Sequence, residues 1–338
     1  MNQSRRFGVA LGFAAVLLSG PAGLTGCEAL RWSHRPARGD RPIRDEQAEF
    51  AAAKGLALAK TGDYSAALAQ FERAIAINPR LTIAYIGVGD IHRQQGDYDA
   101  AERSYSEAAS LEPRNFDAQY LHGVTLHVLK RLGEAVRAYL RALTIRPNNV
   151  DANLNLATAY LQLHEAGQAL PYARHAVQRS PDRAQARVNL AAVYRALDRH
   201  AEAVAEYQQA AELMDLTPEL LLNMADSLGK LRRYAEMQTT LDELIKTSPS
   251  AIAWERLGSA LFRQKRYDEA LEAFNHSLEM DKDHYPALNG VGVCLLNRYV
   301  WSDKTDQQSL RRAIQVLRRS LQIHRNQPRI VELLTRYG

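Results

Sequence analysis

The chain has 338 residues, 46% hydrophobic and 24% charged, which is the composition of a soluble globular protein. Its 43 Lys and Arg residues exceed its 38 Asp and Glu residues by five, and by three once the two arginines of the leader described next are left out. So small an excess argues against a nucleic-acid-binding protein. The two cysteines, Cys27 and Cys294, are too few for a metal site, and we expect Cys294 to pack as a small hydrophobic side chain.

The first 26 residues have the pattern of a secretory leader. Arg5 and Arg6 precede an apolar run over residues 7–18. This run is too short to span a bilayer core, which needs about 20 apolar residues, so residues 1–26 predict a signal peptide rather than a membrane anchor. Residues 24–27, Leu-Thr-Gly-Cys, resemble a bacterial lipobox. The resemblance implies cleavage before Cys27 and lipid attached to its sulfur and its new N-terminus; the alternative is an ordinary secreted protein cut nearby.

Residues 27–47 predict a flexible tether after the lipidated Cys27. The segment is rich in Arg, contains Pro36, Gly39 and Pro42, and has no apolar periodicity. Four acids lie among its arginines, which favours a solvated spacer over a segment that binds anionic headgroups. Glu28, and not Asp, follows the cysteine. By the lipoprotein resemblance, this favours a bacterial outer-membrane location facing the periplasm over the inner membrane.

From residue 48 to residue 325 the sequence repeats with a period of about 34 residues, and such repeats decide the fold. The recurring residues are at positions 7, 8, 11, 20, 27 and 32 of each copy. In the copy at 150–183 they are Leu156, Ala157, Tyr160, Ala169, Ala176 and Pro181. This pattern resembles the tetratricopeptide repeat, in which each unit is a helix, a tight turn and a second, antiparallel helix. Eight copies begin near residues 48, 82, 116, 150, 184, 218, 251 and 285.

The resemblance implies an all-α fold, a right-handed superhelix of about eight such repeats. Stacked repeats bury a continuous core between neighbours, and prolines near position 32 should end each second helix. In the eighth copy an extra loop over residues 299–309, with Trp301 exposed, delays the second helix; a neutral insertion is favoured over a binding loop. Residues 326–338 predict a capping helix whose apolar side carries Ile330, Val331, Leu333 and Leu334.

The sequence contains no motif typical of catalysis. It lacks a phosphate-binding loop and the His-Glu-x-x-His pattern, and Gly87 and Gly89 lie in a repeat helix, where packing explains them better than a dinucleotide site. His122 and His127 are five residues apart, which is poor spacing for sharing a metal ion on one helix face. We therefore expect no enzymatic activity, no cofactor and no metal.

Asparagines recur at position 6 of three successive copies. Asn155, Asn189 and Asn223 stand 34 residues apart, and Arg256 follows in the next copy. At about 100° per residue, position 6 points away from positions 4 and 8, so we expect these side chains outside the core. The series resembles the asparagine ladder in the peptide-binding groove of the nucleocytoplasmic glycosyltransferase superhelix. A groove that holds an extended peptide, with Arg256 available for a carboxylate, is the first site hypothesis; the alternative is that Asn is merely tolerated on a polar face.

The C-terminal segment is strongly basic. Between Leu310 and the C-terminus there are seven arginines and one acid, Glu332. The arginine pairs are seven residues apart and therefore share a helix face, which suggests a docking patch for an acidic or phosphate-bearing partner. A solvated helix face is the alternative. The first pair is Arg311 and Arg312, and the second is Arg318 and Arg319.

Together these features predict a lipid-anchored extracytoplasmic scaffold that binds proteins or extended peptides, in the assembly of bacterial envelope complexes. In plan the chain is similar to the outer-membrane repeat lipoproteins that assist pilus secretins or gather peptidoglycan enzymes. The alternative is a substrate-presenting or regulatory module for a separately encoded envelope enzyme, such as a glycosyltransferase or a peptidoglycan hydrolase.

Overall fold

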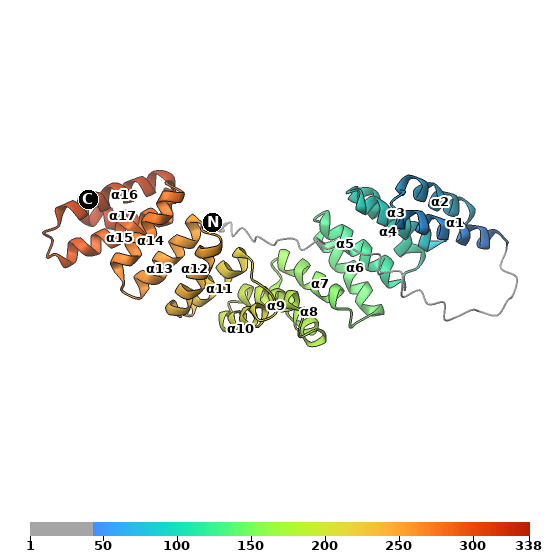
Figure 1. Cartoon of the computed structure of the whole chain (residues 1–338), viewed down its shortest axis with the longest axis horizontal. Coiled ribbons are helices and arrows are strands. Elements are labelled where there is room, and N and C mark those ends of the chain that lie inside the picture. Colours follow the sequence, from blue (N-terminus) through green and yellow to red (C-terminus); the bar gives the residue numbers. More distant parts are fainter. Residues whose placement is uncertain (1–42) are drawn as a thin grey trace, which may run out of the picture. The chain divides into compact units, whose positions relative to one another are not determined.

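The computed structural model describes residues 43–338, which fold into 17 α-helices (Figure 1). The predicted signal peptide, Cys27 and most of the predicted tether lie outside the described residues. Within the described range the fold is all-α, as the sequence predicts. Helices α1 to α16 form eight consecutive helix-turn-helix pairs, and α17 follows them.

The chain divides into two compact units, of which the first ends at Arg179. The helices of the first unit are α1 (Ile43–Lys60), α2 (Tyr64–Ile77), α3 (Thr82–Gln94), α4 (Tyr98–Leu111), α5 (Phe116–Val128), α6 (Leu132–Ile145), α7 (Val150–Gln162) and α8 (Ala166–Arg179). The first helix starts at Ile43 and so begins inside the segment expected to be tether.

The second unit begins at Ser180. Its helices are α9 (Ala184–Ala196), α10 (His200–Ala211), α11 (Pro218–Lys230), α12 (Tyr234–Thr247), α13 (Ala251–Arg263), α14 (Tyr267–Met280), α15 (Tyr285–Trp301), α16 (Gln307–Ile323) and α17 (Pro328–Tyr337).

The turn inside each of the first seven pairs has one residue in the left-handed region. Two of these residues are glycines, Gly62 with φ 84° and Gly96 with φ 81°. The others carry side chains and have φ between 57° and 66°; they are Lys130, His164, Asp198, Arg232 and Lys265. In every case the next amide donates to a carbonyl five residues earlier, for example Asp63 N to Leu58 O at 3.1 Å, which satisfies a carbonyl that the ending helix leaves free.

The ends of the helices follow from single residues. Asp63, Asp97, Asn115 and Asn149 each accept a hydrogen bond from the amide three residues on, which caps the helix that follows. A proline stands at the second residue after five of the second helices, where its missing N–H prevents the helix from continuing. These prolines are Pro79, Pro113, Pro147, Pro181 and Pro249.

Several pairs pack through a glycine on the first helix against a large side chain on the second. A Cβ built on Gly89 would lie 2.7 Å from the Tyr105 ring, and one on Gly123 would lie 2.8 Å from the Tyr139 ring. Both tyrosine side chains are essentially fully buried. Truncating such a ring to Ala costs about 3–5 kcal/mol, so these contacts hold the repeats together.

Position 6 makes a different contact, to the preceding repeat. A Cβ on Gly87 would lie 2.3 Å from the ring of Phe71, which belongs to the pair before it. A Cβ built on Gly290 would likewise lie 2.5 Å from the ring of Phe274 in the preceding pair. The packing interpretation of Gly87 and Gly89 is thus confirmed, since one faces the previous repeat and the other its own second helix.

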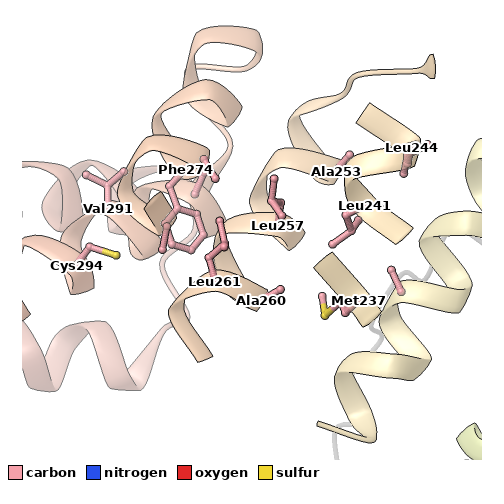
Figure 2. Packing of buried hydrophobic residues seen from close by; sticks show 14 of the residues in the cluster. Met237, Leu241, Leu244, Ala253, Leu257, Ala260, Leu261, Phe274, Val291 and Cys294 are labelled. Atoms are coloured by element: carbon pink, nitrogen blue, oxygen red, sulfur yellow. The ribbon is translucent and has the colours of Figure 1, made fainter. Parts of the chain in front are cut away.

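The core of the second unit is continuous across its helices. Figure 2 shows Leu257 and Leu261 of α13 lying between Phe274 of α14 and Leu241 of α12. Cys294 of α15 belongs to the same cluster, is a free thiol and is 4% exposed. Burial raises the pKa of its thiol to about 12, so it stays protonated and behaves as the small hydrophobic residue that the sequence predicts.

The last pair differs from the others in length. Both α15 and α16 have 17 residues, and the expected loop over 299–309 is shorter than predicted because Trp301 still belongs to α15. The extra residues therefore mainly lengthen the hairpin. Trp301 is 61% exposed and packs edge-on against Tyr267, with ring centroids 4.5 Å apart.

The capping helix α17 covers the end of the second unit. Ile330 is buried in the unit's core, while Leu333, Leu334 and Tyr337 are partly buried against it. Val331 is 48% exposed, so the expectation that it shares the apolar side was wrong: one residue is about 100° of helix turn, which carries Val331 away from Ile330. In the described range no helix is both long and apolar enough to cross a bilayer.

Candidate functional site

The position-6 asparagines are less exposed than the sequence suggests. Asn189 in α9 is 7% exposed, and Asn155 and Asn223 are half-buried. The prediction of a side chain outside the core was wrong for Asn189, whereas Asn155 and Asn223 keep part of their surface exposed. At Asn155, position 6 points away from its own partner helix but toward the preceding repeat, as it does at Gly87. The helical angle within one repeat was correct, but it left the neighbouring repeat out of account.

The asparagines also lie in different units. Asn155 belongs to α7 of the first unit, where its Nδ2 donates to the Tyr120 hydroxyl at 3.1 Å. Asn189, Asn223 and Arg256 belong to the second unit. The candidate site is therefore built from the second unit alone.

Arg256 is not available for an incoming carboxylate in the way expected. Its Nε lies 2.9 Å from Oδ1 of Asp226 in α11, and its Nη1 lies 3.2 Å from Oε2 of Glu255. Ser259 donates a further hydrogen bond to Glu255 Oε1 at 2.9 Å. Glu255 is only 6% exposed, and a buried carboxylate needs such partners. The cluster of Asp226, Glu255 and Arg256 has a formal charge of −1, so a second carboxylate would have to displace an existing pair.

These residues lie on two first helices in contact with each other, α11 and α13. Side chains three and four residues apart share a face of a helix. This places Glu219, Asn223 and Asp226 together on α11, and Ile252, Arg256 and Ser259 together on α13. We call these six residues the first-helix face. Ile252 is 48% exposed, a large apolar side chain among polar neighbours.

Sequence reasoning missed Asp226, Glu255 and Ile252. Asp226 is at position 9 of its copy and Glu255 is at position 5 of the next copy, so the two acids form no repeating pattern along the sequence. They meet only because adjacent first helices stack. The exposed Ile252 at position 2 was visible as a departure from polar residues, Asp151, Gln185 and Glu219, at the same position of the three preceding copies.

The four C-terminal arginines lie on α16 but do not act as one group. Arg312 donates to Asn275 Oδ1 at 3.5 Å, and Arg319 pairs with Asp283 at 2.8 Å. Arg311 and Arg318 have no ion-pair partner among residues 43–338. Together with Arg319 they line an open groove of about 730 Å³.

The first unit contains a buried polar cluster around His122 of α5. The ring Nε2 lies 3.1 Å from Glu102 Oε1, and Arg131 Nη1 lies 3.3 Å from the same oxygen. Burial lowers the pKa of His122, and hydrogen bonding to Glu102 only partly opposes this. His127, the other histidine of the helix, instead lies 3.4 Å from the Tyr139 hydroxyl. Within residues 43–338 no three His, Cys, Asp or Glu side chains are grouped so as to hold a metal ion.

Several solved structures share this fold. The C-terminal part of a TPR repeat-containing protein from Cytophaga hutchinsonii aligns with a TM-score of 0.59 at 10% identity, over 72% of this chain and 97% of that chain. Pseudomonas aeruginosa pilF aligns with a TM-score of 0.53 at 19% identity, over 64% of this chain and 99% of that chain. PilW, described as a widely conserved type IV pilus biogenesis factor, aligns with a TM-score of 0.51 at 20% identity, over 63% and 98%. At these identities the likeness concerns the fold.

The sequence itself gives the family. No curated protein matches the chain. The profile of the tetratricopeptide repeat, however, matches residues 52–109, 88–150, 154–218 and 222–285, which together make up more than half of the chain. The chain therefore belongs to the tetratricopeptide repeat family, whose fold is a scaffold for protein–protein interaction.

Proposed function

We propose that this protein is a scaffold that holds an extended segment of a partner protein on the first-helix face of its second unit. The observation that carries the proposal is the exposure of Ile252 beside the ion pair of Arg256 and Asp226. Surfaces that recognise protein combine an apolar centre with a polar rim, and Ile252 with the neighbouring ion pair has these two elements side by side.

Asn223 suits the polar part of such recognition. An Asn amide offers both a donor and an acceptor, which are the groups that a peptide backbone needs. Each neutral hydrogen bond adds only about 0.5–1.5 kcal/mol, and burying the exposed half of Ile252 adds about 1 kcal/mol. A useful affinity therefore requires a segment long enough to cross both α11 and α13.

The charge of the site argues for a neutral or basic segment. Asp226 and Glu255 outnumber Arg256, and Glu219 on α11 adds a further exposed negative charge. A partner with a Lys or Arg near the bound segment would meet complementary charge, whereas an acidic one would be repelled. This replaces our sequence-based hypothesis that Arg256 captures a carboxylate.

We further propose that the scaffold is anchored to the bacterial envelope through lipid on Cys27 and acts in the assembly of an envelope complex. The lipobox-like residues 24–27 support the anchor, because one cysteine carries the lipid and two or more acyl chains hold a protein stably on a bilayer. The folds of pilF and PilW agree with such a role. Cys27→Ser should move the protein from the membrane to the soluble fraction; retention in the membrane would contradict the anchor.

Site-specific photo-crosslinking in the producing cells tests the binding face. A crosslinking amino acid replaces Glu219 or Ile252, both exposed on the first-helix face, and in the control it replaces Lys246, exposed on the second helix α12. We expect the same partner band from positions 219 and 252 and none from 246. Equal yields at all three positions would refute the face. A band that contains only a single envelope enzyme would favour the alternative of an enzyme-associated module.

A further inference from the structure

The outer side of α16 forms the wall of an open groove at the end of the second unit. The groove has a volume of about 730 Å³ and is lined by Arg311, Ile314, Gln315, Arg318, Arg319, Gln322 and Gly338. Six of these residues belong to α16 at intervals of three and four, so they form one continuous face of the helix. We call this surface the α16 groove. It shares no residue with the first-helix face.

The charge of the α16 groove is positive and only partly compensated. Helix α16 carries four arginines and no acid. Asp283 neutralises Arg319 at 2.8 Å, but neither Arg311 nor Arg318 has an ion-pair partner in the described range 43–338. Both guanidinium groups are exposed and keep several unused N–H donors; Arg311 uses only its Nε, which donates to the backbone oxygen of Gln307 at 3.3 Å. Arginine donors in this state bind carboxylates in a bidentate manner.

The distance between Arg311 and Arg318 determines how far apart the acidic groups of a ligand must be. Residues seven apart on a helix are separated by two turns, about 10.5 Å along the axis. Ile314 lies between them, three residues from Arg311 and four from Arg318, and is half-buried. Gln315 and Gln322 supply donors and acceptors at the sides. The surface thus presents two positive points with one apolar point midway.

A membrane surface fits this face poorly. The apolar side of α16 faces the protein core, where Ala313 and Leu317 are fully buried, and the groove side exposes no apolar residue beyond part of Ile314. Helices that lie in a bilayer interface need a broad exposed apolar face. The chain's own N-terminal segment fits no better, because residues 28–47 hold five arginines against four acids and so carry no net negative charge.

We propose that the α16 groove binds an acidic helical segment of a partner protein. Two carboxylates on the segment, two helical turns apart, pair with Arg311 and Arg318, and an apolar side chain midway between them packs on Ile314. The scaffold then has two surfaces of opposite character, since the first-helix face carries a net negative charge and the α16 groove a net positive one. The two surfaces select different segments.

A designed peptide tests this without knowledge of the natural partner. The probe is a fluorescent, covalently stapled helical peptide with two glutamates seven residues apart and a leucine midway; the control probe has the same composition in scrambled order. Fluorescence anisotropy measures binding to the full chain at low salt. The variant is Arg311→Gln/Arg318→Gln, and the matched control is Arg312→Gln/Arg325→Gln, which removes the same charge outside the groove.

We expect Arg311→Gln/Arg318→Gln to weaken binding at least about tenfold and the control pair by less than about twofold, with binding of the parent lost at high salt. Circular dichroism should show the same helical content in all proteins. Equal losses in both double variants would overturn the proposal, because binding would then follow net charge alone. It would also be overturned by equal binding of the scrambled peptide, by no binding of either peptide, or by binding to phosphatidylglycerol vesicles in place of the peptide.

Discussion

The contact between Gly87 and Phe71 gives the sharpest test of the packing. Gly→Ala in a helix normally stabilises by about 1 kcal/mol. At Gly87, however, the added Cβ would lie 2.3 to 2.7 Å from three atoms of the Phe71 ring. The ring has little room to retreat, because it is fully buried and Gly55 lies close to it on the side of its own pair, where a Cβ would be 2.9 to 3.1 Å from ring atoms. Overpacking costs about 1–3 kcal/mol, so after the gain in helix propensity Gly87→Ala should lower the free energy of unfolding by up to about 2 kcal/mol net.

The matched control is Gly167→Ala in α8, where a new Cβ meets nothing within 4 Å. This variant should be as stable as the parent or more stable, by up to about 1 kcal/mol. Thermal unfolding followed by circular dichroism at 222 nm compares the two variants with the parent. The expected result is a difference in sign between them. Equal melting temperatures for both variants would show that Gly87 does not contact Phe71 as described.

Two other substitutions test the packing and the electrostatics. Ala191→Leu should cost about 1–3 kcal/mol, because Ala191 is fully buried at position 8, whereas Ala192→Leu, on a half-exposed neighbour, should cost little; similar losses would mean that the repeat register is wrong. Burial lowers the pKa of His122, so the unfolded chain takes up its proton first as the pH falls. Stability from this group is complete above the unfolded pKa of about 6.5 and falls below it. His122→Gln should therefore flatten the decline of the melting temperature between pH 7.5 and 5.5; an unaltered slope would exclude His122 as the cause.

Much of the fold follows from the sequence because each repeat carries its own signals. Gly96 and Asp97 form the turn and the cap, Pro113 ends the second helix, and Gly89 and Tyr105 form the pair of small and large residues that packs them. All of these interactions lie within one repeat of about 34 residues, so the residues that make them recur with that period and can be recognised in the sequence. Other turns, such as the one at Lys130, have no glycine. There the packing of the two helices imposes a left-handed backbone conformation on a residue with a side chain, and the sequence gives no sign of it.

The site was harder to predict because it depends on contacts between repeats. The angle of position 6 within its own helix was correct, yet Asn155 is half-buried and bonded to Tyr120, because the preceding repeat lies on that side. Arg256 looked free along the sequence, but Asp226 reaches it from the previous first helix at 2.9 Å. The pattern within one repeat predicts in which direction a side chain points, but it does not predict which residue of the neighbouring repeat that side chain contacts. For the same reason the four arginines of α16 separate into paired and unpaired ones only in three dimensions.

Calorimetry on a partner segment mapped by crosslinking shows whether the first-helix face is the surface that binds it. The variant Asn223→Ala/Ile252→Ser alters that face without changing its charge, and the control Thr239→Ala/Lys246→Ser alters exposed residues of α12. We expect the first to weaken binding by about tenfold or more and the second by less than about twofold, with helical content intact in both. A folded Asn223→Ala/Ile252→Ser variant that binds as tightly as the parent would place the partner on another surface.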